Sequence, residues 1–494
     1  PRVDLNGAGS NSGLVLDELA AGSVIRNLVI RNMSGNGISL TTGAGGNAIQ
    51  GCYIGTNPAG SAAAANGGDG ISISSPSGPL PPAGLTLVDD NVISGNEGDG
   101  IDIFGPNTTL VTIIRNFIGT DRNGLLAVPN GSGGGDNHGI RISADAYGNI
   151  IGGTPPTQSN VIAGNDATIF SDGISVQGNA LLPNVILGNF IGLTPALVLD
   201  LGNGRAGINA VDVRPHDDSP TEVALLIGPT NVIGYNGSTD DPAPGIRITG
   251  TSRGVYVFLN AIGVAEDPSG FIDLGNSGVG VEVTSGPSFV GIDDADNLGG
   301  NFIGANGGSG VEVTGNDIVV QGNLIGDPNP DDAFAMGNDG DGIKIAFGGN
   351  NTIGGAGADQ ANTIRGNGGN GIRVETGSAW ANLLSRNQID RNGRLAIDLD
   401  YFIASGVVDP RDNATSPDPS PSVANNGQNA PTLIGATYNG GSGQTTIQWQ
   451  LESVPSTAGF VLEFFSSPAG DASGSGEAAT FLGEVTGVTT DASG

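Results

Sequence analysis

The sequence is poor in positive charge, and this shortage excludes two classes of partner. Only 17 of its 494 residues are Lys or Arg, against 49 Asp and Glu, and the formal net charge is −32. Proteins that bind nucleic acid use basic side chains to release the counterions of the phosphates, and an anionic membrane surface attracts the same side chains. We therefore expect no nucleic-acid partner. An acidic surface suits an extracellular or saline setting, or the binding of cations.

Cysteine, histidine and long apolar segments are also scarce. Cys52 is the only cysteine, which excludes a disulfide framework and a thiolate metal cluster. The sequence around His138 and His216, the two histidines, indicates neither a Ser/His/Asp triad nor a multi-histidine metal site, so we expect both in loops. No apolar run approaches the roughly 18 residues of a membrane span, and no signal peptide opens the chain. We interpret the sequence as a segment of a longer protein, without direct membrane insertion.

Glycine is abundant, and an asparagine motif recurs with it. The 88 glycines follow no three-residue period and alternate with Ile, Val and Asn, which indicates neither collagen nor a disordered linker. The segment "NVISGN" at Asn91 returns as "NVIAGN" at Asn160, "NVIGYN" at Asn231, "NFIGAN" at Asn301 and "NTIRGN" at Asn362. The first three steps are 69, 71 and 70 residues long, which indicates a repeat made of two similar coils.

A short strand of the form Gly-[Ile/Val]-x-[Ile/Leu/Val] marks each coil. It begins, at intervals of 25 to 39 residues, at positions 37, 70, 100, 139, 173, 207, 245, 280, 310, 342, 371 and, in degenerate form, 396. The strands are rich in Ile and Val, Gly, Asn or Asp closes them, and no segment keeps a helical period. Three short strands per turn predict a parallel β-helix, whose coils bury their apolar residues by stacking. A propeller, with about four longer strands per blade, is the alternative.

Two details of the repeat lead to structural predictions. In "GIDI" the isoleucines should point into the bore and the residue between them outward, by the two-residue period of a strand. The corner asparagines, Asn91 and Asn96 in one coil and Asn160 and Asn165 in another, should stack as ladders whose amides bond the coils above and below. Every second coil carries a long polar insertion, and we expect these insertions to project from one side of the molecule.

The segments "NFIG", "NIIGG" and "NVI" with a following Gly-Asn resemble the right-handed parallel β-helix repeat proteins of the pectate-lyase-like superfamily. The similarity is closest to the large secreted and surface-attached bacterial members and covers about residues 10–400. It implies an all-β fold, a right-handed parallel β-helix and an extracellular or cell-surface location. The superfamily includes lyases, hydrolases, epimerases, phage tailspikes and adhesins, so activity stays open. Its Gly-His-Gly, Arg-Ile-Lys and Asp-Pro-His-Glu motifs are absent from this sequence.

The pattern ends near residue 402, which divides the chain into three parts. We assign residues 1–402 to the β-helix and residues 403–430, rich in Pro, Asp, Asn and Ser, to a linker or a cap over the last coil. In residues 431–494 the segments "TLIGATY", "TTIQWQLE", "GFVLEFF" and "TFLGEVTGV" read as longer strands with turns between them. They predict an antiparallel sandwich-like module that is incomplete.

The outward residues of the marker strands form the clearest candidate site. If the coils are in register, about 4.8 Å separates neighbours in the row Asp102, Arg141, Ser175, Asn209, Arg247, Glu282, Glu312, Lys344, Arg373 and Asp398. Glu282 and Glu312 would then be paired carboxylates or a cation site, with Lys344 or Arg373 as a base. The alternative is a solvated charge ladder, in which Arg247 flanks Glu282 and Lys344 flanks Glu312. We favour the ladder, because the charges compensate and no aromatic residue offers a sugar-stacking platform.

Other acidic residues fall in predicted loops. Catalytic candidates there are Asp89 with Asp90, Asp293 and Asp294 with Asp296, and Asp331 with Asp332, although variable turns explain them as well. Calcium is the ligand best suited to these loops, because Ca²⁺ prefers carboxylate and carbonyl oxygens on flexible segments. The residues that we would assign to it are Asp327, Asp331, Asp332, Asp339, Asp341, Asp409, Asp412 and Asp418. Their spacing matches neither an EF-hand nor a calcium β-roll.

These observations favour a rigid extracellular rod, part of a bacterial surface or secreted protein, that is structural or adhesive and not catalytic. Surface glycans or other copies of the chain are the expected partners, and the insertions the expected contact surface. One alternative is a polysaccharide lyase or glycoside hydrolase with a groove on the β-helix. Another is a self-assembling fibre or sheath subunit whose ends stack on other copies.

Overall fold

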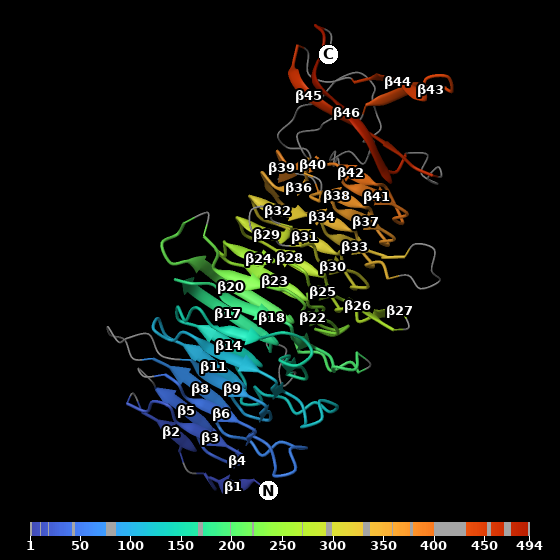
Figure 1. Ribbon diagram of the computed structural model, residues 1–494. Helices are drawn as coiled ribbons and strands as arrows, with labels where there is room; N and C mark the ends of the chain where they lie inside the picture. Colours follow the sequence, from blue (N-terminus) through green and yellow to red (C-terminus); the bar gives the residue numbers. More distant parts are fainter. Residues whose placement is uncertain are drawn as a thin grey trace.

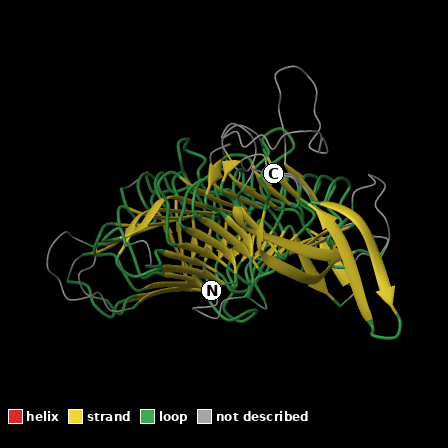
Figure 2. Cartoon of the chain, turned by 90° about the horizontal axis from the view of Figure 1, so that it is seen from above, coloured by secondary structure: helices red, strands yellow, loops and turns green. Residues whose placement is uncertain are grey.

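The computed structural model is a rod of stacked coils that runs from the N-terminus to residue 399, followed by two hairpins (Figure 1). The structure describes the chain except for residues 1, 10, 18, 42–44, 76–84, 166–170, 198, 220–221, 269, 293–298, 330–335, 358, 376–378, 400–430, 452–455, 469–475 and 493–494. All regular elements of the described residues are strands, as the view from above also shows (Figure 2). The same residues contain no helix long and apolar enough to cross a membrane.

Three long parallel sheets form the walls of the rod, and each coil except the last contributes one strand to each sheet; the last coil contributes to sheets A and B alone. Sheet A consists of β1 (Val3–Asn6), β4 (Leu28–Arg31), β7 (Tyr53–Ile54), β10 (Val92–Ile93), β13 (Phe117–Ile118), β16 (Val161–Ile162), β19 (Phe190–Ile191), β22 (Val232–Ile233), β25 (Ala261–Ile262), β30 (Phe302–Ile303), β33 (Leu324–Gly326), β37 (Thr363–Arg365) and β41 (Gln388–Asp390). Sheet B consists of β2 (Leu14–Leu16), β5 (Ile38–Thr41), β8 (Ile71–Ser74), β11 (Ile101–Phe104), β14 (Ile140–Ser143), β17 (Ile174–Ala180), β20 (Ile208–Pro215), β23 (Ile246–Thr249), β28 (Val281–Val283), β31 (Val311–Val313), β34 (Ile343–Ile345), β38 (Ile372–Val374) and β42 (Ile397–Leu399). Sheet C consists of β3 (Val24–Arg26), β6 (Ala48–Gln50), β9 (Thr86–Asp89), β12 (Val111–Ile114), β15 (Ile150–Gly152), β18 (Asn184–Leu187), β21 (Leu225–Ile227), β24 (Val255–Val257), β29 (Ser288–Gly291), β32 (Ile318–Gln321), β36 (Thr352–Gly354) and β40 (Leu383–Ser385).

Sheet B contains all twelve marker strands predicted from the sequence. They are β5, β8, β11, β14, β17, β20, β23, β28, β31, β34, β38 and β42, and they pair in this order from coil to coil. The sequential order in every sheet, with a full turn of chain between neighbours, is that of a parallel β-helix. The prediction of a right-handed parallel β-helix is confirmed.

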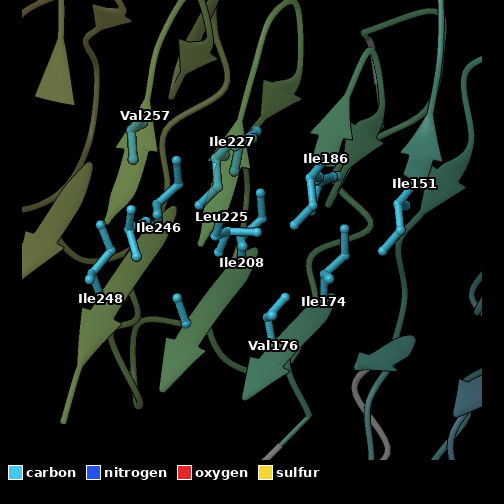
Figure 3. Packing of buried hydrophobic residues seen from close by; sticks show 14 of the residues in the cluster. Ile151, Ile174, Val176, Ile186, Ile208, Leu225, Ile227, Ile246, Ile248 and Val257 are labelled. Carbon is cyan, nitrogen blue, oxygen red and sulfur yellow. The ribbon is translucent and has the colours of Figure 1, made fainter. Parts of the chain in front are cut away.

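A continuous core of isoleucine and valine fills the bore. In β11 the side chains of Ile101 and Ile103 are fully buried, while Asp102 between them points outward. The same alternation brings Ile174 and Val176 of β17 into contact range of the core residues of the neighbouring coils (Figure 3). Each coil therefore buries its apolar residues only because another coil lies on each side.

Buried asparagines form two ladders along the corners of the rod. In each rung, the side-chain Nδ2 group donates to Oδ1 of the asparagine in the next coil, as Asn91 does to Asn116 at 2.9 Å. The first ladder continues through Asn160, Asn189, Asn231, Asn260, Asn301, Asn323, Asn362 and Asn387. The second contains Asn66, Asn96, Asn130, Asn165, Asn203, Asn236, Asn276, Asn306, Asn338, Asn367 and Asn392. The predicted asparagine ladders are confirmed.

The insertions follow every second strand of sheet A. Seven residues connect β10 to β11, whereas 21 connect β13 to β14. Three insertions close with the same isolated bridge, seven residues apart in the chain: Thr56 to Ala63, Thr120 to Ala127 and Leu193 to Asp200. A fourth contains the hairpin of β26 (Val264–Asp267) and β27 (Gly270–Asp273). They leave from one edge, as expected. Gly60 and Gly124 of the first two insertions lie against Tyr53 and Phe117 of sheet A, and Phe271 of the fourth lies against Phe302.

Two hairpins follow the last coil. They are β43 (Thr432–Asn439) with β44 (Gln444–Gln450), and β45 (Ala458–Ser466) with β46 (Thr480–Thr489), all antiparallel. The four strands predicted from the sequence are present, but they form separate two-stranded sheets rather than one sandwich. A short sheet of β35 (Gly348–Gly349) and β39 (Ala379–Trp380) lies beside sheet C. The predicted linker or cap, residues 403–430, lies outside the described residues.

Candidate functional site

The outward row of sheet B has the register predicted from the sequence. Successive rungs pair in the order Asp102, Arg141, Ser175, Asn209, Arg247, Glu282, Glu312, Lys344, Arg373 and Asp398. Glu282 and Glu312 are therefore neighbours, as expected. From Asp102 to Arg373, each residue lies between two residues that are buried in the core, so this part of the row is held by the rigid part of the molecule. At Asp398 the neighbouring Ile397 is 44% exposed.

Each carboxylate of the Glu282 and Glu312 pair has a cation on its other side. Arg247 Nε donates to Glu282 Oε2 at 2.7 Å, and Lys344 Nζ lies 3.5 Å from Glu312 Oε1. Lys344 Nζ also lies 3.5 Å from Glu375, a residue that follows the next strand. About a quarter of each of these side chains is exposed, so each pair contributes at most a few tenths of a kcal/mol. This geometry is that of a compensated charge ladder.

The acids assigned to calcium do not come together within the part of the chain that the structure describes. Asp327 and Asp341 are buried, and each accepts a backbone N–H, from Asn329 at 2.9 Å and from Asn370 at 2.6 Å respectively. Asp339 is exposed. The described residues contain no group of three His, Cys, Asp or Glu that could hold a metal ion. The remaining candidates, Asp331, Asp332, Asp409, Asp412 and Asp418, lie outside the described residues.

One of the predicted loop acids lies in a strand. Asp89 is the last residue of β9 and is 3% exposed, where it accepts hydrogen bonds from Arg115 at 2.7 and 2.5 Å. Asp90, the next residue, has a left-handed backbone with φ of 58° and is exposed. The expectation of a loop was wrong for Asp89 because its ion pair compensates the burial of a charge at the strand end. Asp293, Asp294 and Asp296 lie outside the described residues.

The two histidines differ in their surroundings. His216 lies in an exposed turn. His138 lies in the connection before β14, as expected, but only 1% of its side chain is exposed. Its Nε2 atom is 3.6 Å from Asp136, and its Nδ1 atom is 3.5 Å from Asp172. Arg205 reaches the same two carboxylates, at 3.8 and 3.5 Å.

These contacts define an acid–histidine cluster on sheet B, which sequence reasoning missed. Its members are Asp69, Asp99, Asp102, Asp136, His138, Arg141, Asp172 and Arg205. Asp69, Asp99, His138 and Asp172 each stand directly before the glycine that opens a marker strand. The signal was available, because "DGI" occurs three times and "HGI" once at consecutive marker strands.

Burial dominates the electrostatics of the acids in the cluster. It raises the pKa of Asp99 to about 7, although His138 acts in the opposite direction. Burial and the charge of Asp69 raise the pKa of Asp102 to about 6, and burial raises the pKa of Asp172 as well. The Oδ1 atom of Asp102 has no hydrogen-bond partner among the described residues.

The accessible edge of the cluster is Asp136, whose side chain is 68% exposed. The contact with His138 lowers the pKa of Asp136, so it is a carboxylate at neutral pH. Carboxyl groups that titrate near neutrality, beside a histidine and arginines, are the groups that general acid–base chemistry uses. In this structure Asp99, His138 and Asp172 are each at least 97% buried, so a substrate would meet Asp136, Asp102 and the arginines first.

The comparisons with known proteins concern the fold. No protein-family model matches the sequence, and a comparison with curated proteins finds no match. Among solved structures, the Dettilon tailspike protein gp208 is 14% identical over 97% of this chain and 82% of its own, with a TM-score of 0.37. A mutant of the periplasmic alginate epimerase AlgG is 13% identical over 77% and 76%, with a TM-score of 0.36. The A-module of the mannuronan C-5 epimerase AlgE6 of Azotobacter vinelandii is 14% identical over 80% and 88%, with a TM-score of 0.32.

Similarities of this size carry no assignment of chemistry. The assignment of the fold rests on the strand register itself, coil after coil in three parallel sheets. The chain is a right-handed parallel β-helix repeat protein.

Proposed function

We propose that the chain is a rigid rod that serves as a structural and adhesive element of a secreted or cell-surface protein, and that it binds a linear polysaccharide along sheet B. The observation that carries the proposal is the row from Arg247 to Arg373, with one partly exposed charged residue per coil in exact register with its neighbours. Regularly spaced acids and bases on rigid strands suit a polymer that repeats hydroxyl and acidic groups. Such an array binds through many weak contacts, not through one deep pocket.

The insertions supply a second surface for the same role. They leave every second coil from one edge of sheet A, and three of them are closed by an internal bridge. In the first two, a glycine also packs on an aromatic ring of sheet A. Leu125 and Leu126 of the second insertion are 48% and 60% exposed. Loops on a rigid scaffold commonly carry partner specificity. We assign the choice of partner to these insertions.

The test is a binding assay with a panel of neutral and uronic-acid polysaccharides, each with Ca²⁺ and with a chelator. We expect at least one glycan to co-sediment with the rod, and the triple variant Glu282→Ala, Glu312→Ala, Lys344→Ala to bind it at least tenfold more weakly. The matched control is Thr112→Ala with Thr352→Ala, two outward residues of sheet C. If both variants lost the same amount of affinity, or if no glycan bound to the rod, sheet B would not be the binding surface. The chelator arm also tests the proposed Ca²⁺ ligands.

A second candidate function is a polysaccharide-modifying enzyme, and the acid–histidine cluster is the observation that favours it. Asp99 and Asp102, with pKa values of about 7 and 6, could exchange protons near neutral pH. Arg141 and Arg205 could neutralise the acid group of a uronate sugar beside them. The exposed Asp136 would be the first group that such a sugar meets.

Incubation of the same panel separates the two functions. New reducing ends would reveal hydrolysis, and ultraviolet absorbance of unsaturated products would reveal elimination. Turnover that disappears in Asp136→Asn but persists in Glu312→Ala would place the chemistry in the acid–histidine cluster. Binding without turnover would leave the adhesive rod as the function.

A further inference from the structure

A third ladder runs along the edge where the chain enters sheet B, and we name it the entry ladder. Its rungs are the residues directly before the marker glycines. Asn36 Oδ1 accepts the backbone N–H of Asp69 at 2.8 Å, and Asp69 Oδ1 accepts that of Asp99 at 3.0 Å. Asp99 Oδ1 accepts the N–H of His138 at 2.5 Å, and His138 Nδ1 accepts that of Asp172 at 3.2 Å. Each rung therefore joins one coil to the next by a single side-chain acceptor.

Asparagine is sufficient for this task. It fills the first rung, Asn36, and a late one, Asn370, whose Oδ1 accepts the N–H of Leu395 at 3.1 Å. An amide oxygen accepts the N–H group at every pH, whereas a buried carboxylate must be desolvated when it ionises. The fold therefore gains nothing from titratable residues here. Nevertheless four consecutive rungs, Asp69, Asp99, His138 and Asp172, are titratable.

The surroundings of these rungs make ionisation costly. Asp99 is 3% exposed and faces Asp69 in the preceding coil, Asp102 on the strand that follows it and His138 in the following coil. Arg141 faces Asp69 and Asp102 from β14. A negative charge on Asp99 would thus lie close to two other acids and away from water.

At Asp172, the last titratable rung of the run, more partners are present. It is 0% exposed and faces His138, Arg205 and the amide of Asn209, and Asp136 lies across His138 and Arg205. Its Oδ1 accepts the N–H of Ala206 at 3.0 Å. In the following coils the rungs are Ala206, Pro244, Val279 and Ser309, none of which titrates.

We propose that the coils between Asp69 and Asp172 form a pH-sensitive zone of the rod, in which loss of protons from the buried aspartate rungs loosens the hydrogen bonds between coils. Below neutral pH, Asp99 carries a proton and its other oxygen still accepts the N–H of His138. Above neutral pH, Asp99 is ionised, and water can hydrate its carboxylate only when the coil opens. The free energy of local opening therefore falls, and opening becomes more frequent. The zone depends on the ladder geometry alone and is independent of what the rod binds.

Hydrogen exchange of the whole chain, followed by mass spectrometry at about pH 5 and about pH 8, tests this proposal. After correction for the intrinsic pH dependence of exchange, we expect peptides from β8, β11 and β14 to exchange at least tenfold faster at the higher pH. Peptides from β23, β28 and β31, whose coils have no titratable rung, should show no such change. Equal corrected behaviour of the two groups would overturn the proposal.

Two variants separate the rungs from other causes. Asp99→Asn keeps the acceptor oxygen and removes the titration, so it should reduce the pH dependence of the zone at least threefold. Asp341→Asn makes the same change on the same ladder outside the zone, and it should leave exchange in β11 and β14 unaltered. Thermal unfolding at about pH 5 reports whether each variant is folded. A pH dependence that survives in folded Asp99→Asn would also refute the proposal.

Discussion

A glycine in each of the first two insertions lies directly over an aromatic ring of sheet A. A β-carbon at Gly60 would lie 2.8 Å from Cε2 of Tyr53, and one at Gly124 would lie 2.7 Å from Cε1 of Phe117. Both glycines have a left-handed backbone, with φ of 65° and 67°. At these two positions glycine is needed twice, for the turn and for the close approach to the ring.

Mutation can separate the two reasons for glycine, the left-handed backbone and the close approach to the ring. Gly124→Ala should cost about 2 to 4 kcal/mol of unfolding free energy, from the backbone and from the clash with Phe117. Gly134 has φ of 81° and open space around its Cα, so Gly134→Ala should cost only about 1 to 2 kcal/mol. Urea denaturation of both variants measures the difference. Equal losses would mean that the insertion does not rest on Phe117.

At Asp99, stability should depend on pH with a definite sign. Its folded pKa of about 7 lies above the ordinary value of 3.8, so the folded state binds the proton more tightly than the unfolded state. The stability from the protonated form is fully present below about pH 4 and is lost as pH rises through about 7. Asp99→Asn should therefore raise the unfolding free energy by about 2 to 4 kcal/mol at pH 8 and by much less at pH 4.

Urea titrations across this pH range measure both curves. The difference in unfolding free energy between wild type and Asp99→Asn should increase with rising pH and level off above about pH 8. A difference that is constant with pH would indicate that the amide stabilises the rung for reasons other than its lack of charge. A variant less stable than wild type at pH 8 would show that ionised Asp99 has a partner that this structure lacks.

Among the elements, the corner ladders bind each coil to its neighbours. Asn189 accepts the side-chain amide of Asn160 at 2.9 Å and donates to Asn231 at 3.1 Å and to the carbonyl of Ile151 at 2.9 Å. All these groups are buried, so none of them can turn to water when its partner is removed.

We therefore expect Asn189→Ala to destabilise the rod by about 3 kcal/mol or more. Asn123→Ala, which removes an exposed asparagine in the second insertion, is the control and should cost less than about 1 kcal/mol. Thermal or urea unfolding monitored by circular dichroism gives both values. A loss below about 1 kcal/mol at Asn189 would contradict the ladder as a source of stability.

The strands of sheet B and the corner asparagines could be predicted from sequence because their rules are local. An Ile-x-Ile strand after glycine specifies which side chain points inward, and Asn91 and Asn96 recur at constant places in the coil. The packing of Gly60 and Gly124 on aromatic rings joins an insertion to its own sheet, and no local pattern predicts that contact. Asp89 was misplaced for a similar reason, since its partner Arg115 is a full coil away.

The difference between local patterns and contacts across coils also explains why only part of the acid–histidine cluster could be predicted from the sequence. Asp69, Asp99, His138 and Asp172 are about 30 to 39 residues apart in the chain, and the stacking of coils makes them neighbours. The register of the marker strands already places these four residues in one row, because each stands directly before a marker glycine. Asp136 and Arg205 belong to connections of unequal length, and their positions follow only from the structure.

On the scale of the whole molecule, the second hairpin closes one corner of the last coil. Glu463 of β45 accepts hydrogen bonds from Ser385 Oγ at 2.7 Å and from the backbone N–H of Arg386 at 2.8 Å. Ala478, just before β46, forms an isolated bridge with Ile389 of β41, the last strand of sheet A. An unpaired strand edge is a site for unwanted pairing, and Ala478 covers part of this one.

Glu463→Ala should release the hairpin from the rod. We expect the amides of Arg386 and Ile389 to exchange at least tenfold faster in hydrogen-exchange experiments, while amides in the middle of the rod keep their protection. Glu222→Ala, an exposed residue far from the last coil, is the control. Unchanged protection at Arg386 would show that the remaining contacts, the bridge of Ala478 and the pairing of Arg386 with Glu484 and Phe481, hold the hairpin without Glu463.

The corner ladders also have a direction, and this sets how the length of the molecule can change. In every rung the amide donates toward the C-terminal coil, and the acceptor that it needs is always another asparagine in the same place. If a pair of coils were duplicated within the rod, its first asparagines would therefore accept from the preceding coil. Its last asparagines would donate to the following coil. Gene duplication in steps of about 70 residues could lengthen or shorten the rod without any new packing solution. Reach, the distance from an anchored end to a distant partner, is thus the property that evolution can adjust most easily in this architecture.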